Sequence, residues 1–248
     1  MENQAQQNQP KKKRKWLWWL VGIIGFFIIV GIFSNGSNNT SSPTSSGNGS
    51  IEKVGNSESK EEVMPEPALI ELSGTGQQAS QKFTLENGLS IFKMTHSGTS
   101  NFSITLMDSD GQRVELLVNE IGKFDGAKAV GVSKKGEYVL DISANGNWTI
   151  KIEQPRPTSA QSEAQTFTGI GQQVTPIFNL DKGLKTFKMK HSGKSNFSVV
   201  LMDKKGNNIE LLVNEIGDFD GSKAVGINRT GLYLLDISAD GEWTVVME

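Results

Sequence analysis

The two histidines have the widest chemical range of any side chains in this sequence. His96 and His191 lie 95 residues apart, and each precedes a Ser-Gly pair. Ser97 and Asp141 would complete the residue set of a serine hydrolase, but nothing here has the sequence of a strained nucleophile turn. A metal site recruits several His, Cys, Asp or Glu ligands, and each place offers a single histidine. We predict no catalytic residue, no metal site and no cofactor. We keep His96 and His191 as candidate ligand contacts, although hydrogen-bonded strand-end residues are the favoured interpretation.

Two further groups of residues have a chemical and a structural interpretation. Asp108 and Asp110 have the alternate spacing of a calcium loop, but Lys205 stands 95 residues after Asp110, and lysine cannot bind calcium. A turn is therefore favoured there. Trp148 and Trp243 could stack on sugars, yet they alternate with apolar residues along their segments, which predicts core positions.

An internal duplication determines how these residues are positioned. The octapeptide ELLVNEIG occurs at 115–122 and again at 210–217, within a longer stretch in which 73–153 aligns with 168–248 without a gap and with more than half of the positions identical. We expect the octapeptide to be structural, with Leu116 and Val118 on a core face and Asn119–Gly122 forming a turn. Glu120 and Glu215 could be ligands, but a lone carboxylate beside a turn is usually solvated.

Apolar residues alternate along each copy, which predicts half-buried strands. The expected inward sets in the first copy are Phe102, Ile104 and Leu106; Val114, Leu116 and Val118; Tyr138, Leu140, Ile142 and Ala144; and Trp148, Ile150 and Ile152. Gly, Asp and Asn cluster between these runs, and no convincing amphipathic helix is present. The sequence thus predicts an all-β fold of two tandem antiparallel β-sandwich, jelly-roll-like domains, with seven or eight strands in each copy.

The last strands of each copy carry a recurring motif. GEYVLDISANGNWTIKIEQP returns as GLYLLDISADGEWTVVME, which shares the residues Gly136, Tyr138, Leu140, Asp141, Gly146 and Trp148 with Gly231, Tyr233, Leu235, Asp236, Gly241 and Trp243. This motif resembles the closing strands of bacterial extracytoplasmic β-sandwich modules, including the pre-peptidase C-terminal type. The resemblance implies a non-catalytic accessory domain. The peptidase that usually neighbours such modules is absent from this sequence, so a role in enzyme processing does not carry over.

The amino-terminal region predicts a membrane anchor. Five consecutive basic residues, 11–15, precede an uncharged apolar run at 16–33, which in a helix would be about 27 Å long, close to the hydrocarbon core of a bilayer. The positive-inside rule places the tail in the cytoplasm and the rest outside. A cleaved signal peptide is the alternative, with Ser34 and Gly36 as small residues near a cleavage site, but the run exceeds the usual signal core.

The composition between these features sets the expected domain boundaries. Ser, Gly and Asn dominate the stretch after the apolar run, which predicts a flexible tether. We expect a basic cytoplasmic tail at 1–15, a transmembrane helix at 16–33 and the tether at 34–67. The first β-sandwich repeat is expected at 68–154, a linker at 155–165 and the second repeat at 166–248.

Differences between the copies point to an interaction surface. On the predicted outward face, Thr105, Glu137, Val139 and Lys151 of the first copy correspond to apolar residues in the second, namely Val200, Leu232, Leu234 and Val246. If their strands lie side by side, these residues form an apolar patch of the kind found at interfaces. We expect this candidate interface to pack against the first copy, another subunit or an envelope partner, or to be covered by a loop of its own domain.

Charge and cysteine content restrict the classes of partner. The net charge of −2 provides no basic face for nucleic acid, and the absence of cysteine excludes disulfides and thiolate metal sites. We therefore expect a non-enzymatic, single-pass protein of a bacterial cell membrane, with an extracellular carboxy terminus. Its expected partners are the bilayer through 16–33, and a protein, a second copy or a cell-wall polymer. A carbohydrate-binding protein and a hydrolase with an unrecognised site are the alternatives.

Overall fold

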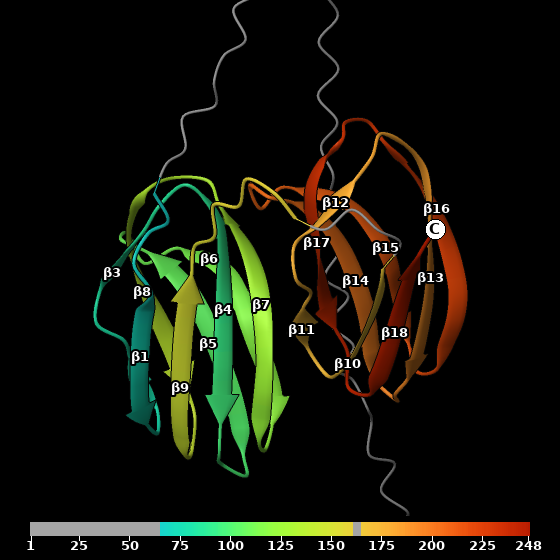
Figure 1. The fold of residues 1–248 in the computed structure, drawn as a ribbon. Helices are drawn as coiled ribbons and strands as arrows, with labels where there is room; N and C mark the ends of the chain where they lie inside the picture. Colours follow the sequence, from blue (N-terminus) through green and yellow to red (C-terminus); the bar gives the residue numbers. More distant parts are fainter. Residues whose placement is uncertain (1–64, 161–164) are drawn as a thin grey trace, which may run out of the picture. The chain divides into compact units, whose positions relative to one another are not determined.

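Antiparallel β-sheets make up the fold of the part of the chain that the computed structural model describes, residues 65–160 and 165–248 (Figure 1). All of these residues belong to one compact unit, Ser59–Glu248. Residues 65–160 and 165–248 contain no helical segment with the length and hydrophobicity needed to span a bilayer. The predicted transmembrane helix at 16–33, most of the tether and residues 161–164 of the predicted linker lie outside those ranges.

Two successive groups of nine strands correspond to the two copies of the sequence. The first group, called repeat 1, consists of β1 (Ile70–Thr75), β2 (Gln78–Ala79), β3 (Phe83–Leu85), β4 (Gly88–His96), β5 (Asn101–Asp108), β6 (Arg113–Ile121), β7 (Phe124–Val132), β8 (Gly136–Ser143) and β9 (Asn147–Glu153). The second group, repeat 2, consists of β10 (Thr166–Ile170), β11 (Gln173–Val174), β12 (Phe178–Leu180), β13 (Gly183–Ser192), β14 (Asn196–Asp203), β15 (Asn208–Ile216), β16 (Phe219–Ile227), β17 (Gly231–Ser238) and β18 (Glu242–Met247).

Each repeat is built from two antiparallel sheets with the same strand order. In repeat 1 the orders are β1-β9-β4-β7 and β2-β8-β5-β6, with β3 also paired to β8. In repeat 2 they are β10-β18-β13-β16 and β11-β17-β14-β15, with β12 also paired to β17. Apolar residues from both sheets of a repeat form one core, in which Phe92, Phe102 and Leu140 of repeat 1 are fully buried. The alternation of apolar residues therefore turns the sheets face to face.

The number of strands is higher than the predicted seven or eight per repeat. The additional elements are short: β2 has two residues and β3 has three, and both lie against β8. In repeat 2, β11 and β12 take the same places against β17. Segments of this length are too short to show an alternating pattern, so the sequence reading missed them.

The predicted inward face of β6 is wrong because the strand contains irregular pairing. Ile104 pairs with Val118, but the next residue, Thr105, pairs with Leu116, which leaves Leu117 as an extra residue. Leu117 and Val118 are consequently both buried, Leu116 is half-buried, and Val114 is exposed. An extra residue of this kind reverses the alternation beyond it.

The last residue of the predicted repeat 1 and the beginning of the predicted linker are both attached to repeat 1. Gln154 is buried, and its side-chain carbonyl accepts a hydrogen bond from the backbone N–H of Glu86 at 2.7 Å. The Arg156 guanidinium donates to the backbone carbonyls of Asn87 and Leu89 at 3.0 and 3.1 Å. These contacts fix the point at which the chain leaves repeat 1.

Candidate functional site

The two histidines occupy equivalent buried positions at the ends of β4 and β13. The His96 ring stacks on Phe102 at a centroid distance of 4.4 Å, and the His191 ring stacks on Phe197 at 4.6 Å. Each Nδ1 lies close to a backbone carbonyl, that of Gly122 at 2.6 Å or Gly217 at 2.8 Å. Because a carbonyl only accepts, Nδ1 carries the hydrogen. The histidine thereby ties the end of its strand to the turn between β6 and β7, or between β15 and β16.

The glycine of each His-Ser-Gly sequence is required by the packing of this ring. A Cβ on Gly98 would lie 2.2 Å from Asn145 Oδ1 and 2.5 Å from His96 Nε2. A Cβ on Gly193 would lie 2.1 Å from Asp240 Oδ1 and 2.4 Å from the His191 ring. The glycine backbone therefore lies directly over the imidazole. This close approach accounts for the repeated tripeptide without any catalytic role for its serine.

The residues that could be combined on paper into a hydrolase are not brought together. The Ser97 hydroxyl donates to the Asn147 carbonyl at 3.3 Å rather than to the imidazole. Asp141 is exposed on β8, which belongs to the sheet opposite β4. Among the residues of 65–160 and 165–248, no group of three or more His, Asp or Glu side chains is arranged to hold a metal ion.

The turn between β17 and β18 makes the two histidine sites electrically different. Asp240 Oδ1 lies 3.3 Å from His191 Nε2, whereas repeat 1 has Asn145 at the equivalent position. Backbone hydrogen bonds, led by that of Lys194, and then the nearby His191 lower the pKa of Asp240 below its ordinary value of 3.8. His191 Nε2 makes no hydrogen bond. A proton on this nitrogen would face the carboxylate, so only the repeat 2 site can form an ion pair.

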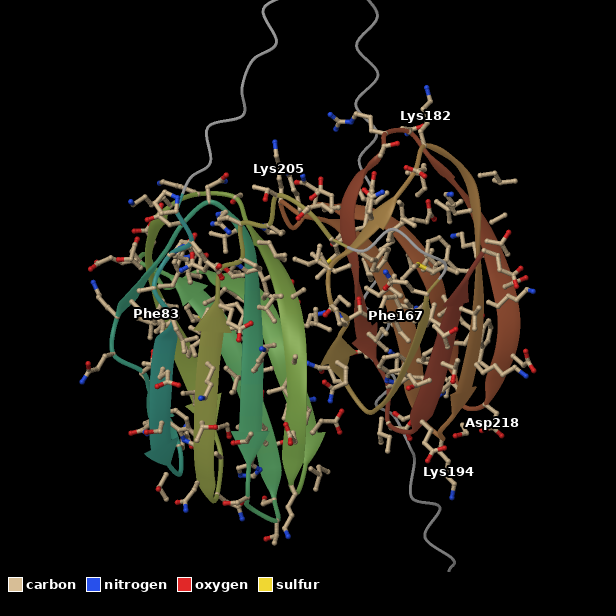
Figure 2. The ribbon with its side chains drawn as sticks, in the orientation of Figure 1. Phe83, Phe167, Lys182, Lys194, Lys205 and Asp218 are labelled. Atoms are coloured by element: carbon tan, nitrogen blue, oxygen red, sulfur yellow. The ribbon has the colours of Figure 1, made fainter. Side chains whose placement is uncertain are left out.

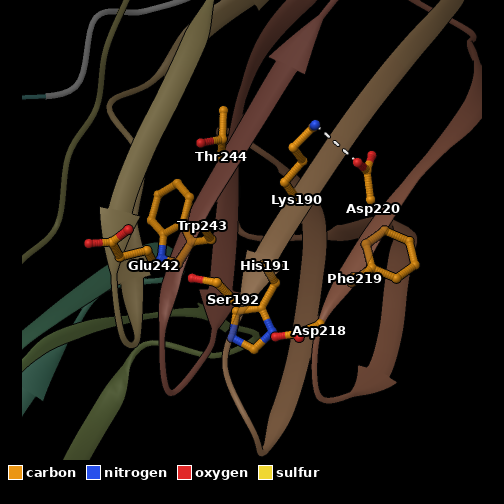
Figure 3. A pocket seen from close by; sticks show the side chains of 9 residues that line it. All are labelled: Lys190, His191, Ser192, Asp218, Phe219, Asp220, Glu242, Trp243 and Thr244. Atoms are coloured by element: carbon orange, nitrogen blue, oxygen red, sulfur yellow. Dashed lines mark ion pairs between the residues drawn. The ribbon is translucent and has the colours of Figure 1, made fainter.

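A surface hollow of about 440 Å³ lies over this site in repeat 2 (Figure 3). It has charged residues at its rim and aromatic side chains below them, and the Lys190 ammonium pairs with Asp220 at 3.0 Å. The hollow is lined by Lys190, His191, Ser192, Asp218, Phe219, Asp220, Glu242, Trp243 and Thr244. With Nδ1 engaged and Nε2 buried, His191 presents no base to a molecule in the hollow.

The tryptophans and the aspartate turns have structural positions. Trp148 and Trp243 are buried, and their indole N–H groups donate to the carbonyls of Gly76 and Gly171 at 3.0 and 2.9 Å. This confirms the predicted core positions and leaves no indole face for a sugar. The Asp108 carboxylate accepts the backbone N–H groups of Asp110 and Gln112, which is turn chemistry.

A contact between the two repeats, called the seam, buries an apolar cluster separate from both cores. Its residues in repeat 1 come from β4 and β7, and its residues in repeat 2 come from β14 and β17 with the segment around β11. The cluster consists of Leu89, Ile91, Ala127, Ala129, Met202 and Leu234, with Val174, Ile177 and Val200 packed against it. Leu89 and Leu234 are fully buried. Burial of this kind contributes about 1.5–3 kcal/mol for each large side chain.

Polar groups of repeat 2 satisfy the open edge of the first repeat's sheet. β7 is an edge strand, and its outward N–H groups at Ala127 and Ala129 donate to the Gln172 carbonyl at 3.1 Å and to Asp236 Oδ1 at 3.0 Å. The Gln172 amide in turn donates to the Leu117 carbonyl at 2.9 Å. An edge that would otherwise be open to pairing with another chain is thereby closed.

An ion pair lies at the centre of the seam. Lys128 Nζ of β7 and Asp236 Oδ2 of β17 are 2.5 Å apart, and the Asp236 side chain is 5% exposed. Burial alone would lower the pKa of Lys128, but the charge and hydrogen bond of Asp236, with a contribution from Glu115, raise it overall. Lys128 is therefore held charged by its partner across the seam.

The four residues of the candidate interface do not all lie on one surface. Val200 and Leu234 lie on the neighbouring strands β14 and β17 and belong to the seam cluster. Leu232 is buried on the same strand as Leu234. Val246 lies on β18, in the other sheet of repeat 2, so the condition that these strands lie side by side is not met for this residue.

The octapeptide has a feature that the sequence interpretation missed. Ile121 and Ile216 end β6 and β15, and each is 81% exposed beside a glycine with positive φ. Figure 2 labels Asp218 and Lys194 at the end of repeat 2 where this hairpin turns. The signal was present in the sequence as an apolar residue retained in a polar turn. The seam residues Gln172 and Asp236 gave no such signal, since repeat 1 has the same residue types at 77 and 141.

Comparisons with known proteins identify no family. No family model and no curated protein matches the chain. Similar solved structures include a conserved protein of unknown function, PA5104, from Pseudomonas aeruginosa PAO1, with 11% identity, a TM-score of 0.22 and coverage of 71% of this chain and 80% of that one. The PBSX exported protein XepA has 10% identity, a TM-score of 0.24 and coverage of 74% and 86%. A fucolectin from striped bass (Morone saxatilis) serum has 11% identity, a TM-score of 0.21 and coverage of 71% of this chain and 84% of that one. TM-scores of this size carry no argument about function.

Proposed function

We propose that this chain is a single-pass protein of the bacterial cell envelope that presents two non-catalytic jelly-roll domains to an extracytoplasmic binding partner. The basic residues 11–15 followed by the apolar run 16–33 support the anchor and its orientation. The order of strands within each pair of sheets, with β2 and β3 counted as one interrupted strand, supports the jelly-roll assignment.

The exposed isoleucine of each hairpin carries the proposal. Ile121 and Ile216 occupy equivalent hairpin tips, and burial gives neither of them a structural role at 81% exposure. Single exposed apolar residues are ordinary on protein surfaces, but here the same residue is presented twice, in identical octapeptides. Two equivalent apolar tips are suited to a partner that both domains engage, with a gain in avidity.

Proximity labelling of the full chain in its own cells tests this function. The label would be attached at the carboxy terminus, and the variant would carry Ile121→Ser and Ile216→Ser together. We expect the variant to lose neighbours that the unaltered chain labels, because an apolar contact in each domain is removed. Leu69→Ser is the matched control, since Leu69 is 51% exposed but lies outside the hairpins. The hairpin proposal is rejected if both variants label the neighbours of the unaltered chain.

Protease treatment of intact cells tests the location independently. The two domains should be digested from outside while the basic tail is protected. Protection of the domains until the cells are lysed would place them inside and contradict the proposed orientation. The alternative of carbohydrate binding through Trp148 and Trp243 has no support in their buried positions.

A further inference from the structure

We propose that copies of this chain associate head to tail, through surfaces that repeat the seam between chains. The seam joins two different surfaces. The surface on repeat 1, called the receiving edge, consists of Leu89, Ile91, Ala127, Lys128, Ala129 and Gly131. The surface on repeat 2, called the inserting face, consists of Gln172, Val200, Met202, Gly206, Leu234 and Asp236. Duplication leaves each chain with a second receiving edge on repeat 2 and a second inserting face on repeat 1.

No residue of 65–160 or 165–248 covers the receiving edge of repeat 2. Leu184 stands where repeat 1 has the fully buried Leu89, and Leu184 is 74% exposed. Ser222 and Ala224 of the edge strand β16 are exposed at the positions of the buried Ala127 and Ala129. Equivalence with β7 directs their N–H groups away from β13, as donors toward a partner.

The inserting face of repeat 1 keeps the polar groups that the seam uses. Asp141 corresponds to Asp236 and is exposed, and Gln77 corresponds to the buried Gln172 and is also exposed. Lys223 of the open edge corresponds to Lys128. Its ammonium donates to Glu210 Oε1 at 2.6 Å and to the Leu211 carbonyl at 2.7 Å, which leaves the third N–H for a carboxylate. Charge complementarity between Lys223 and Asp141 therefore repeats that of Lys128 and Asp236.

Backbone contact is also reproducible between chains. A Cβ on Gly131 would lie 2.2 Å from the Gly206 carbonyl, so the two glycines allow the repeats to approach. The equivalent residues are Gly226 and Gly111, and a Cβ on either meets nothing within 4 Å. Gly111 has a positive φ of 76°, which by itself favours glycine, whereas Gly226 is retained although no described residue lies close to its Cβ position.

The association should be weaker than the seam. Thr105, Lys82 and Thr186 replace Val200, Ile177 and Ile91, so the surfaces between chains bury fewer apolar groups. Each contact joins the receiving edge of one chain to the inserting face of another. A pair of chains therefore still has one free receiving edge and one free inserting face, and association continues into rows or rings. This proposal does not depend on the hairpin tips or on a partner protein.

Charge reversal with the full chain in detergent micelles tests the proposal by sedimentation velocity. Lys223→Asp and Asp141→Lys each place like charges at every contact between chains. We therefore expect the association of each variant alone to be weakened by at least about tenfold. An equimolar mixture restores opposite charges at both kinds of contact, so association should return. Lys190→Asp, a charge reversal outside these surfaces, should associate like the unaltered chain.

Gly226→Arg provides a second variant that leaves the charges in place. The side chain has open space in the isolated chain, so the thermal midpoint should be unchanged while association is lost. The proposal is overturned if the unaltered chain stays monomeric at all concentrations, if the single variants associate normally, or if their mixture fails to associate.

Discussion

The turn before the last strand distinguishes the buried histidine sites of the two repeats. The turn residue is Asn145 in repeat 1 and Asp240 in repeat 2, and only the carboxylate can pair with a protonated imidazole. Both histidines were predicted at strand ends, but the sequence contained no sign of the ring stacking. The stacking partners, Phe102 and Phe197, come from the next strand along the chain, which lies in the opposite sheet. Such contacts across the core depend on tertiary packing.

Asp240→Asn should change the acid stability of the protein. The folded-state pKa of Asp240 lies below its ordinary value of 3.8, so the charged group stabilises the fold above this pH, and the stabilisation is lost as the pH falls through the folded pKa. The midpoint of thermal unfolding of the unaltered chain should therefore exceed that of the variant at neutral pH, and the two should converge below pH 3.8. A constant difference at every pH would contradict this assignment.

Gly193→Ala should destabilise repeat 2 by about 1–3 kcal/mol, because the new methyl group overlaps both Asp240 Oδ1 and the His191 ring. Gly226→Ala is the matched control, since it adds a methyl group where there is open space. Chemical denaturation of both variants measures the difference in the free energy of unfolding. Equal effects of the two substitutions would show that the ring contact is unimportant.

Regular strands were predictable from sequence, and irregular ones were not. Phe102, Ile104 and Leu106 of β5 are all fully buried, as their alternation predicted. The same reasoning failed for β6, because the extra residue Leu117 depends on pairing with β5 and not on local composition. It also missed the seam partners of β7, since an edge strand is defined only by the order of strands in the sheet.

Asp236→Ala should cost about 3 kcal/mol, because it leaves Lys128 charged without its partner and the Ala129 N–H without its acceptor. Asp141→Ala changes the equivalent but exposed residue and should remain within about 0.5 kcal/mol of the unaltered chain. Calorimetry should also show two transitions in place of one for Asp236→Ala, as the repeats lose their coupling. A single unshifted transition would exclude a stabilising role for the ion pair.

At the scale of the whole molecule, duplication was visible in the sequence, and so was the all-β class. The comparison of the copies selected Val200 and Leu234, which pack in the seam, because Val200 stands in place of Thr105 and the larger Leu234 stands in place of Val139. It also selected Val246, which lies in the other sheet. The alternation of residues shows that a side chain points outward, but it does not show to which of the two sheets its strand belongs. Residues that are identical in the copies but differ in burial, such as Asp141 and Asp236, were invisible to it.

The contact between Gly131 and Gly206 makes the order of the two repeats in the chain matter. Transposing its halves would join Gly226 to Gly111 and present Lys82 and Thr186 at the new junction in place of two isoleucines. The transposed chain would thus have, between its own repeats, the weaker contact that we assign to neighbouring molecules. The two surfaces that form the seam in the natural order would then be exposed, and they would mediate association between chains.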